Sequence, residues 1–381
     1  MKVNKKLENF LSGRWDFRYN IITSKIEYAK KGENNFKPVT DRIFFSILRQ
    51  ITSETDIKCS EKKLREILGS NFVPAFHPFH TYFESIPNWD GEDHLGKLAG
   101  LVKTQNDQFW PVAFKKWFIA MVATMREVEI VNHQFIMLLG PQGIGKTTFC
   151  YILVPKELKH YIYIGNPNFK SKDSQFTLAE CFLIIFDEVD YLTLSKIETL
   201  KEAITKPHIN DRRPYGRTKE YMPKVASFIG SGNNMQPLSD LTGSRRFLCF
   251  ETLKIDQDGL KKVSIEQCYA QALHLLETGF KYYFSEKDIV EIEENNKYFQ
   301  SVNVEEELLL NHFNPIQTAE FPNEKLLMTS EILQYICARE NLHFNPNKSN
   351  MLGKILKKNE FQRVPFKSRY RIRVFVSDKY Y

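Results

Sequence analysis

The sequence predicts an α/β protein with a parallel sheet at its centre, an α-rich N-terminal region and a winged-helix-like module at the C-terminus. Three observations lead to this prediction. Continuous apolar runs at residues 135–139, 181–186 and 225–229 are typical of buried parallel strands. A glycine-rich turn and a helical pattern follow the first run. Two helical segments and a basic two-stranded ribbon close the chain, in the order of a winged helix-turn-helix.

The composition shifts along the chain divide it into four expected regions. Residues 1–95 form an N-terminal accessory region of mixed α/β structure, and residues 96–285 form the sheet core. Residues 286–324 form an acidic connector that contains two prolines and some helix. Residues 325–381 form the basic module. These lengths fit one large domain flanked by smaller ones.

Within these regions the local patterns specify individual elements. Ser60 is expected to cap one helix, and Thr329 another, because hydroxyl side chains accept hydrogen bonds from the free N–H groups of a first turn. A fourth core strand is expected at 246–250. Helices are expected at residues 41–52, 60–68, 109–127, 267–283, 329–340 and 347–359.

Composition also excludes several classes of protein. No apolar run approaches the roughly 18–20 residues that span a bilayer, and no apolar segment follows the charged N-terminus, so neither a membrane segment nor a signal peptide is expected. The six cysteines form no C-x-x-C pair. This pattern indicates reduced thiols in a cytoplasmic protein rather than a zinc ribbon or a disulfide framework.

The net charge of +7 is concentrated in two segments. Residues 354–381 hold nine Lys and Arg against two acidic residues, and residues 206–224 hold six against two. Basic clusters interleaved with aromatic residues favour contact with nucleic-acid phosphates. A solvated charged face is the alternative that composition leaves open.

The strongest motif is a phosphate-binding loop at residues 140–147, which match G-x-x-x-x-G-K-[ST] between a strand and a helix. Glycines let successive backbone N–H groups point at phosphates, Lys146 adds a cation for the β- and γ-phosphates, and Thr147 offers a hydroxyl to Mg²⁺. We therefore expect ATP and Mg²⁺ as ligands. The expected nucleotide-binding residues are Gly140, Pro141, Gln142, Gly143, Ile144, Gly145, Lys146, Thr147 and Thr148.

Two acidic residues follow the second apolar run. A parallel strand delivers Asp187 and Glu188 at the edge where a phosphate-binding loop also opens. Asp187 would hold Mg²⁺ together with Thr147, and Glu188 would polarise the attacking water. Asp190 lies close by, beyond the strand end. Charged residues that merely cap the next helix are the alternative interpretation.

Polar residues also follow the third strand, and an arginine pair stands at the start of the fourth. Asn233, with Asn234 as second choice, would orient the lytic water from the end of the third strand, although Gly-Asn sequences also form simple turns. Arg245 or Arg246 would reach the γ-phosphate bound by a neighbouring subunit, since an arginine can offset charge in the transition state. One of the two arginines could instead form a structural ion pair.

These motifs, taken in order, resemble the virulence-associated protein E family, which is itself similar to superfamily 3 helicases and to the helicase halves of phage and mobile-element primases. The resemblance covers roughly residues 87–251. It depends on the loop together with the segments Trp89–Gly91, Phe186–Glu188, Lys201–Thr205, Arg213–Arg217, Phe228–Asn233 and Leu241–Phe247.

The resemblance implies an AAA+-like P-loop NTPase of the superfamily 3 helicase type. In such a ring motor, Asn233 takes the sensor position and Arg245 or Arg246 the arginine-finger position. A hairpin within residues 206–224 would enter the channel, where Arg212, Arg213, Arg217 and Lys219 contact DNA phosphates and Tyr215 stacks on a base. Two departures are Gly232, where the family leads us to expect a threonine, and the absence of a primase metal-binding constellation in residues 1–95.

The leading hypothesis is therefore an ATP-hydrolysing DNA helicase or replication-initiation ATPase of a phage, plasmid or integrated mobile element. It would act as a hexamer-type homo-oligomer, with single-stranded DNA in the channel and duplex DNA on the C-terminal module through Arg369 and Arg371. The alternative is an ATP-regulated DNA-binding switch without unwinding activity. A small-molecule kinase would explain neither the arginine pair nor the basic tail.

Overall fold

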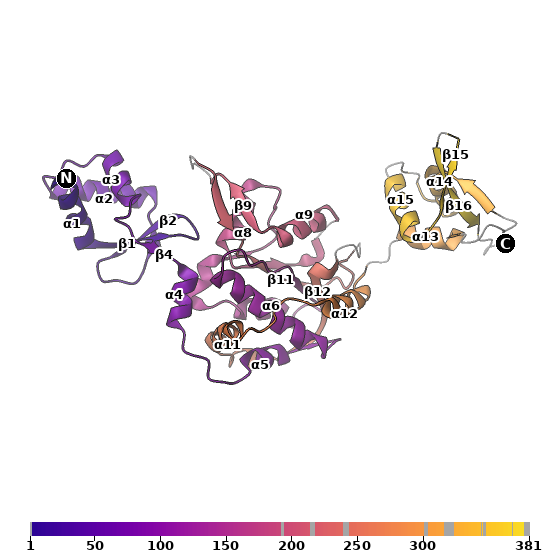
Figure 1. Cartoon of the computed structure of the whole chain (residues 1–381), viewed down its shortest axis with the longest axis horizontal. Helices are drawn as coiled ribbons and strands as arrows, with labels where there is room; N and C mark the ends of the chain where they lie inside the picture. Colours follow the sequence, from indigo (N-terminus) through magenta and orange to yellow (C-terminus); the bar gives the residue numbers. More distant parts are fainter. Residues whose placement is uncertain are drawn as a thin grey trace. The chain divides into compact units, whose positions relative to one another are not determined.

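The structure is a computed structural model in which the chain forms two separate units (Figure 1). The first unit consists of residues 1–237 and 241–299, and the second of residues 300–381 with the short piece 238–240. The described residues are 2–191, 194–213, 218–238, 244–300, 304–315, 324–343, 345, 348–367 and 369–376. None of the described helices has both the length and the apolar character needed to cross a membrane.

The first unit begins with an N-terminal lobe, residues 1–76, in which helices cover a small sheet of order β3-β2-β1-β4. Thr40 and Ser60 cap its second and third helices by accepting hydrogen bonds from Ile43 N and Lys63 N, so the predicted role of Ser60 is confirmed. Its elements are α1 (Lys2–Arg14), β1 (Trp15–Asn20), β2 (Lys25–Lys30), β3 (Lys37–Pro38), α2 (Asp41–Glu54), α3 (Glu61–Leu68) and β4 (Ala75–Phe76).

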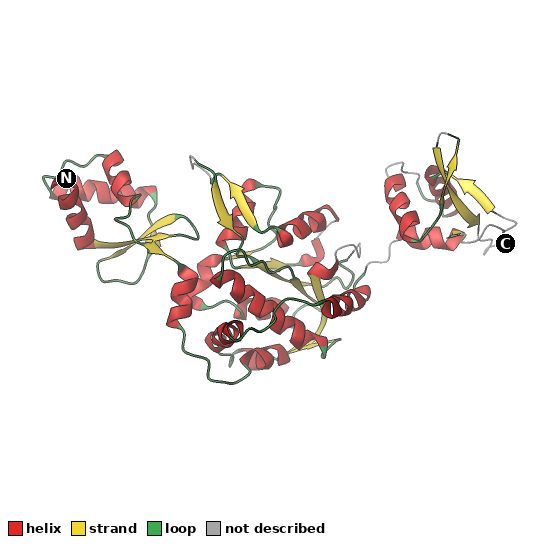
Figure 2. Cartoon of the chain, viewed as in Figure 1, coloured by secondary structure: helices red, strands yellow, loops and turns green. Residues whose placement is uncertain are grey.

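The centre of the first unit is a six-stranded sheet of order β5-β12-β6-β11-β8-β7. All its strands are parallel except β5, which pairs antiparallel with β12. The four predicted core strands are confirmed as β6, β8, β11 and β12, and Figure 2 shows helices on both sides of them. The strands are β5 (Val102–Thr104), β6 (Phe135–Leu139), β7 (Ile162–Ile164), β8 (Leu183–Asp187), β11 (Ser227–Gly232) and β12 (Phe247–Ile255).

Helices and one hairpin complete this unit. The helical elements are α4 (Pro78–Ser85), α5 (His94–Gly100), α6 (Phe109–Arg126), α7 (Lys146–Ile152), η1 (Lys156–Tyr161), α8 (Lys172–Glu180), η2 (Val189–Tyr191), α9 (Leu194–Thr205), η3 (Ser244–Arg246), α10 (Gln257–Leu260), α11 (Ile265–Glu277) and α12 (Glu286–Lys297). The hairpin consists of β9 (His208–Asp211) and β10 (Glu220–Pro223), which pair antiparallel.

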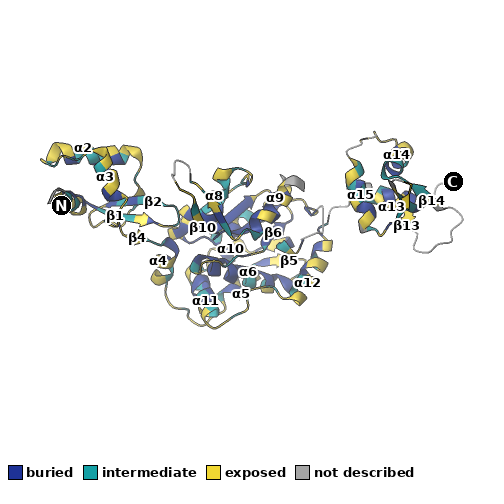
Figure 3. Cartoon of the chain, turned by 45° about the horizontal axis from the view of Figure 1, so that its top comes forward, coloured by how far each residue is buried: buried dark blue, intermediate teal, exposed yellow. Residues whose placement is uncertain are grey.

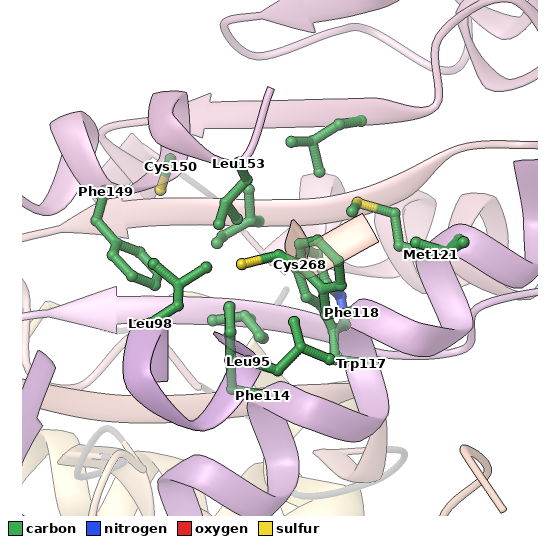
Figure 4. Close-up of a cluster of buried hydrophobic side chains, with 14 of the residues drawn as sticks. Leu95, Leu98, Phe114, Trp117, Phe118, Met121, Phe149, Cys150, Leu153 and Cys268 are labelled. Carbon is green, nitrogen blue, oxygen red and sulfur yellow. The ribbon is translucent and has the colours of Figure 1, made fainter. Parts of the chain in front are cut away.

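Helix α6 is the centre of the hydrophobic core, and it is buried around most of its circumference (Figure 3). Phe118 contacts Tyr269 of α11 edge-on, while Trp110 contacts Phe149 of α7 and Phe250 of β12. Figure 4 shows part of this cluster between the helices and the sheet. Each such buried aromatic ring contributes roughly 1.5–3 kcal/mol through removal from water, so this packing fixes α7 and the preceding loop against the sheet.

Two predicted helices differ in detail from the structure. The helix expected at 267–283 ends at Glu277, because Gly279 adopts a left-handed conformation (φ +79°) that ends the helix. Thr329 does not cap its helix; it is the first helical residue, and the Glu331 carboxylate instead accepts a hydrogen bond from Met328 N. In the segment expected as a connector, Asn295 and Asn296 of α12 bond to the carbonyl groups of β12.

The second unit has its own hydrophobic core, formed by residues such as Leu333, Leu352 and Val374. Both predicted helices and both strands of the predicted basic ribbon are confirmed, and two further strands pair with β16. Its elements are α13 (Val304–His312), β13 (Phe313–Pro315), β14 (Glu324–Leu327), α14 (Thr329–Arg339), α15 (Lys348–Lys358), β15 (Arg363–Phe366) and β16 (Arg369–Val376).

Lys224, which belongs to the basic stretch 206–224, is buried rather than available to a ligand. Its ammonium group donates hydrogen bonds to the carbonyl oxygens of Ile204 and Asn132 and lies 5.0 Å from the Phe228 ring. Burial lowers the pKa of Lys224 to about 7, because the interior disfavours the charged form. The unfolded chain keeps the ordinary value near 10.5.

This buried lysine predicts a specific pH dependence of stability. Below pH 7 both states hold the proton, and the fold bears the full cost of the buried charge. Between pH 7 and about 10 the unfolded state holds a proton that the folded state has released, so stability rises with pH. Relative to Lys224→Met, the free energy of unfolding should rise by about 1.4 kcal/mol per pH unit in this window. Urea unfolding at several pH values measures this difference. Plots of the free energy of unfolding against pH that are parallel for the wild type and Lys224→Met would contradict the prediction.

Candidate active site

The candidate site lies where three neighbouring parallel strands end at the same level. Strand β11 lies between β6 and β8, with Gly232 paired to Leu139 and Ser231 paired to Asp187. Residues that follow these strands therefore meet at the carboxyl edge of the sheet, which is where open α/β sheets bind ligands. Figure 1 shows β11 in the middle of this sheet.

The glycine-rich loop at residues 140–145 connects β6 to α7 and surrounds the Lys146 side chain. Gly140, Gly143 and Gly145 all have positive φ angles, of 142°, 83° and 96°. The buried Lys146 ammonium donates to the carbonyl oxygens of Gly140 (2.7 Å) and Pro141 (2.6 Å). Burial lowers the pKa of Lys146, and the nearby Asp190 carboxylate opposes this shift. The positive charge thus lies inside the turn formed by the loop.

The remaining expected nucleotide-binding residues lie at the surface of this loop and of the first turn of α7. Pro141 and Gln142 are exposed, Ile144 is half-buried, and Thr148 is exposed at the start of α7. Gln257 of α10, which sequence reasoning missed, donates a hydrogen bond from Nε2 to the carbonyl oxygen of Ile144 (3.0 Å). Its side chain also fills the space that a Cβ at Gly145 would need, so α10 supports the loop from outside.

The loop glycines differ in the space available for a side chain, and a pair of alanine substitutions tests this difference. A Cβ at Gly140 would lie 2.6 Å from the backbone oxygen of Thr252, whereas a Cβ at Gly143 would meet nothing within 4 Å. Gly140→Ala should therefore lower the free energy of unfolding by at least about 2 kcal/mol, because a backbone clash adds to the unfavourable φ. Gly143→Ala should cost only about 1 kcal/mol. Chemical denaturation measures both, and equal losses would contradict the steric explanation.

Three oxygen-bearing side chains meet beside the loop. Thr147 Oγ1 lies 3.3 Å from Asp187 Oδ1 and 3.0 Å from Ser231 Oγ, and Ser231 Oγ lies 3.5 Å from the same carboxylate oxygen. Ser231 was not predicted as a site residue, although it lies in the Phe228–Asn233 segment that carries the family resemblance. Hydroxyl and carboxylate oxygens are the ligands that Mg²⁺ prefers, completed by water and phosphate oxygens. The donor set therefore fits the expected ion.

No described part of the chain gathers three or more His, Cys, Asp or Glu side chains into a metal-binding cluster. A cation at this edge would accordingly depend on Asp187, the two hydroxyl groups and the bound phosphates. This dependence is typical of Mg²⁺, which is usually held by one or two carboxylates together with substrate phosphates rather than by an all-protein cage.

Asn233 and Asn234 have different surroundings. The Asn233 side-chain oxygen accepts a hydrogen bond from Lys146 Nζ (3.3 Å), so Asn233 faces the loop. Asn234 instead closes its own turn by accepting a hydrogen bond from Gln236 N (2.9 Å). Glu188 is exposed next to Asp187 and holds a left-handed backbone conformation (φ +59°), which is unfavourable for a residue with a Cβ. Such conformations often mark functional sites.

Arg245 and Arg246 lie at the opposite edge of the sheet from the loop. They directly precede β12, whose first residue, Phe247, pairs with the first residue of β6. A five-residue strand at about 3.3 Å per residue places roughly 13 Å between this edge and the loop. Arg245 is exposed and Arg246 half-buried, and Asn296 of α12 fixes η3 by donating to the carbonyl oxygen of Ser244 (2.9 Å).

The predicted DNA-contacting residues of the hairpin separate into three groups. Arg212 and Lys219 are exposed, while Tyr215 and Arg217 lie outside the described residues. Arg213 has a different environment from the one we expected.

The Arg213 guanidinium forms ion pairs with Glu180 and with Glu220, donates to the carbonyl oxygen of Ile22, and lies over the Phe176 ring. Its charge is thus compensated within the protein, and it ties the hairpin to α8 and to the N-terminal lobe. Sequence reasoning could not see this, because Glu180 lies far away along the chain.

The hairpin also presents an aromatic pair that sequence reasoning missed. The Tyr221 side chain is 54% exposed, and its ring lies 4.6 Å from the His208 ring at an angle of 33°. Tyr221 lies opposite Asn210, and His208, two residues from Asn210 on the same face, is its diagonal neighbour. Met222 and Ile209 lie opposite each other on the buried face. An exposed ring supported by a second ring is a surface on which a base can stack.

In the second unit, the expected DNA-contacting residues lie on β16. The Arg371 guanidinium donates to the carbonyl oxygen of Leu326 (3.0 Å) and lies 4.4 Å from the Phe366 ring. Arg369 begins β16, but its side chain lies outside the described residues. The Arg371 guanidinium is therefore held by contacts within the ribbon and with β14, and these contacts leave its positive charge uncompensated.

Comparison with known proteins gives three findings. The model of the virulence-associated protein E-like domain matches residues 83–301, more than half of the chain. The replication factor C large subunit of Pyrobaculum neutrophilum is 27% identical over an alignment of 168 residues that covers 39% of this chain and 40% of that protein. The chain thus spans less than half the length of this curated relative.

Solved structures give the third finding. The A form apo structure of the NrS-1 C terminal region matches with a TM-score of 0.50 and 14% identity, over 98% of this chain and 99% of that chain, which indicates a shared fold. A structure described as SCCmec type IV Cch, an active helicase, matches with a TM-score of 0.38 and 9% identity, over 95% and 92% of the two chains.

Proposed function

This chain belongs to the family defined by the virulence-associated protein E-like domain, and from that premise we propose that it is a DNA-replication ATPase. More specifically, it would act as an ATP-dependent DNA helicase or replication-initiation ATPase of a phage, plasmid or integrated mobile element, in the cytoplasm of a bacterial cell. The observation that carries this proposal is the meeting of Lys146, Asp187 and Asn233 at one sheet edge. The similarity to a replication factor C large subunit supports the link to replication.

Each site residue then has a chemical role. The loop N–H groups and Lys146 would bind the ATP phosphates, and the helix that begins at Lys146 adds its positive end. Thr147 and Asp187 would hold Mg²⁺, which neutralises charge on the phosphates when bound. Glu188 would accept a hydrogen bond from the attacking water and polarise it, while Asn233 would orient the same water. Glu188 directly follows the last residue of β8 and holds a left-handed conformation.

The arginine pair supports an oligomer. Because Arg245 lies at the edge opposite the loop, we infer that it serves the ATP site of a neighbouring subunit rather than its own. A head-to-tail contact of this kind closes into a ring when the rotation permits. We propose a hexamer-type homo-oligomer of the kind that the family resemblance implies, with single-stranded DNA in its channel and duplex DNA bound by the C-terminal module.

ATP hydrolysis and strand separation by the full-length protein test this proposal. The wild-type protein should hydrolyse ATP faster when single-stranded DNA is added, and it should open a forked duplex in the presence of ATP. Hydrolysis that single-stranded DNA does not change would contradict the motor. A fork that stays closed while ATP strengthens DNA binding would instead support the alternative, a DNA-binding switch.

The exposed hairpin residues give a separate prediction. Tyr221→Ala should weaken binding of single-stranded DNA by about tenfold, because stacking contributes roughly 1–3 kcal/mol per base. The salt dependence should be unchanged, since no charge is lost. Lys219→Ala should instead lower the slope of log K against log salt by about 0.7. Fluorescence anisotropy at several salt concentrations measures both, with Tyr221→Phe as the control that keeps the ring. Equal behaviour of Tyr221→Ala and Tyr221→Phe would contradict stacking.

A further inference from the structure

The chain beyond β8 follows a path that returns it to the neighbouring strand. Glu188 turns the backbone through its left-handed conformation, and Val189 is then buried with 1% exposure. Val189 packs against the backbone of Gly230 and Gly232 of β11, where a Cβ would lie 2.7 Å and 2.5 Å from its methyl groups. The two glycines thus create the space that this turn occupies.

Asp190 ends this turn with its carboxylate on the backbone of the sensor segment. Its oxygens accept hydrogen bonds from Asn233 N at 3.0 and 2.9 Å and from Asn234 N at 2.8 Å. These N–H groups follow the end of β11, and in the part of the chain that the structure describes the strand pairing of β11 stops at Gly232. A carboxylate is well suited to this role, since charge-assisted hydrogen bonds are about twice as strong as neutral ones.

Gly232, the last residue of β11, leaves space for the Asp190 side chain. A Cβ at position 232 would lie 2.7 Å from Asp190 Oδ1, which is too close for any real contact. The glycine that stands where the family resemblance led us to expect a threonine therefore makes room for the Asp190 carboxylate. The Asp190 side chain therefore connects the turn after β8 to the residues after β11 through hydrogen bonds.

From this geometry we propose that Asp190 is a positioning residue for the reaction, a deduction that rests on the proposed ATPase function. By fixing the backbone of Asn233, Asp190 holds the Asn233 amide oxygen toward Lys146 and the site. We assign this role to the hydrogen bonds by which the Asp190 carboxylate holds the backbone N–H groups of Asn233 and Asn234. The Asp190 side chain thus connects the turn at Glu188 to the backbone of Asn233.

Three substitutions separate hydrogen bonding from charge at this position. Asp190→Asn keeps an acceptor oxygen, and one oxygen of Asp190 already lies within reach of both N–H groups. Asp190→Glu keeps the charge but moves the carboxylate by one methylene group. Asp190→Ala removes both. Asp258→Ala, at an 84% exposed carboxylate, is the matched control for the loss of an acidic side chain.

We expect kcat to depend on a correctly placed acceptor oxygen at position 190 and not on the negative charge. Asp190→Ala and Asp190→Glu should lower the kcat for ATP hydrolysis by about 30- to 100-fold, with KM changed less than about threefold, since misplacing a reacting group costs about this much. Asp190→Asn should retain kcat to within about fivefold. If Asp190→Asn loses as much as Asp190→Ala, or if Asp190→Ala retains full kcat, the proposal is overturned.

Amide hydrogen exchange tests the same proposal without enzyme activity. The N–H groups of Asn233 and Asn234 should exchange at least about 30-fold faster in Asp190→Ala than in the wild type, and they should stay protected in Asp190→Asn. Unchanged exchange in Asp190→Ala would overturn the proposal. If the wild-type protein hydrolyses no ATP, the proposed function is refuted. The hydrogen exchange of Asn233 and Asn234 would then still show whether Asp190 holds their backbone. If Asp190→Ala does not fold, the Asn and Glu variants give the decisive comparison.

Discussion

Replacing Lys146 with alanine is expected to reduce ATP hydrolysis by about 1000-fold or more, the largest effect of any substitution considered for this chain. The Lys146 ammonium is the positive charge inside the glycine-rich loop, where the carbonyl oxygens of Gly140 and Pro141 and the side chain of Asn233 surround it. A phosphate group would replace these neutral partners with a charged one. In a site that excludes water, such an electrostatic contact is worth far more than at an exposed surface.

The fold should survive this substitution, so the loss can be assigned to the site. Helix α7 remains anchored by Phe149 and Cys150, both fully buried in the core. Steady-state hydrolysis and the melting temperature of Lys146→Ala should be compared with those of Lys97→Ala, a lysine whose side chain is 64% exposed. Hydrolysis by Lys146→Ala within tenfold of the wild type would refute the assignment of the loop as the ATP site.

Arg245→Ala is expected to have the second-largest effect, a loss of about 100- to 1000-fold in ATP hydrolysis. The position of Arg245 at the edge opposite the loop means that this loss should arise in the neighbouring subunit's site. ATP binding by the substituted subunit itself should therefore be unchanged, which a fluorescent ATP analogue measures. Arg126→Ala, at a partly exposed arginine paired with Glu277, is the matched control.

Mixing two inactive proteins tests the action between subunits directly. In rings assembled from equal amounts of Lys146→Ala and Arg245→Ala subunits, an intact loop meets an intact arginine at roughly a quarter of the contacts. Hydrolysis should therefore return to roughly that fraction of the wild-type rate. If mixtures remain as inactive as the separate proteins while assembling normally, Arg245 does not act on its neighbour.

Much of the fold could be predicted because its signals are local. The strands β6, β8 and β11 overlap the apolar runs at residues 135–139, 181–186 and 225–229, and the G-x-x-x-x-G-K-[ST] motif places a turn and a helix after the first of them. The ends of elements were less predictable. The end of α11 depends on the conformation of Gly279, and the start of α14 depends on the Glu331 side chain.

The residues that complete the site were harder to predict, because their partners are distant in sequence. Gln257 contacts the loop across 113 residues, and Ser231 meets Thr147 across 84 residues. Neither residue type has a spacing that signals its role. Arg213 shows the converse, since a basic pattern cannot reveal that Glu180 and Glu220 compensate the charge. The catalytic and ligand-binding roles themselves remain predictions for the experiments above.

The order of strands in the sheet has a consequence for biosynthesis. Strand β6 is paired on both sides by strands made much later, with β11 beginning at Ser227 and β12 at Phe247. While the ribosome is still translating residues 140–226, β6 has no parallel neighbour, and both its edges are open to other chains. The nascent protein must therefore delay this pairing until about residue 255 has left the exit tunnel. Truncations before that point should yield aggregates rather than a smaller folded ATPase.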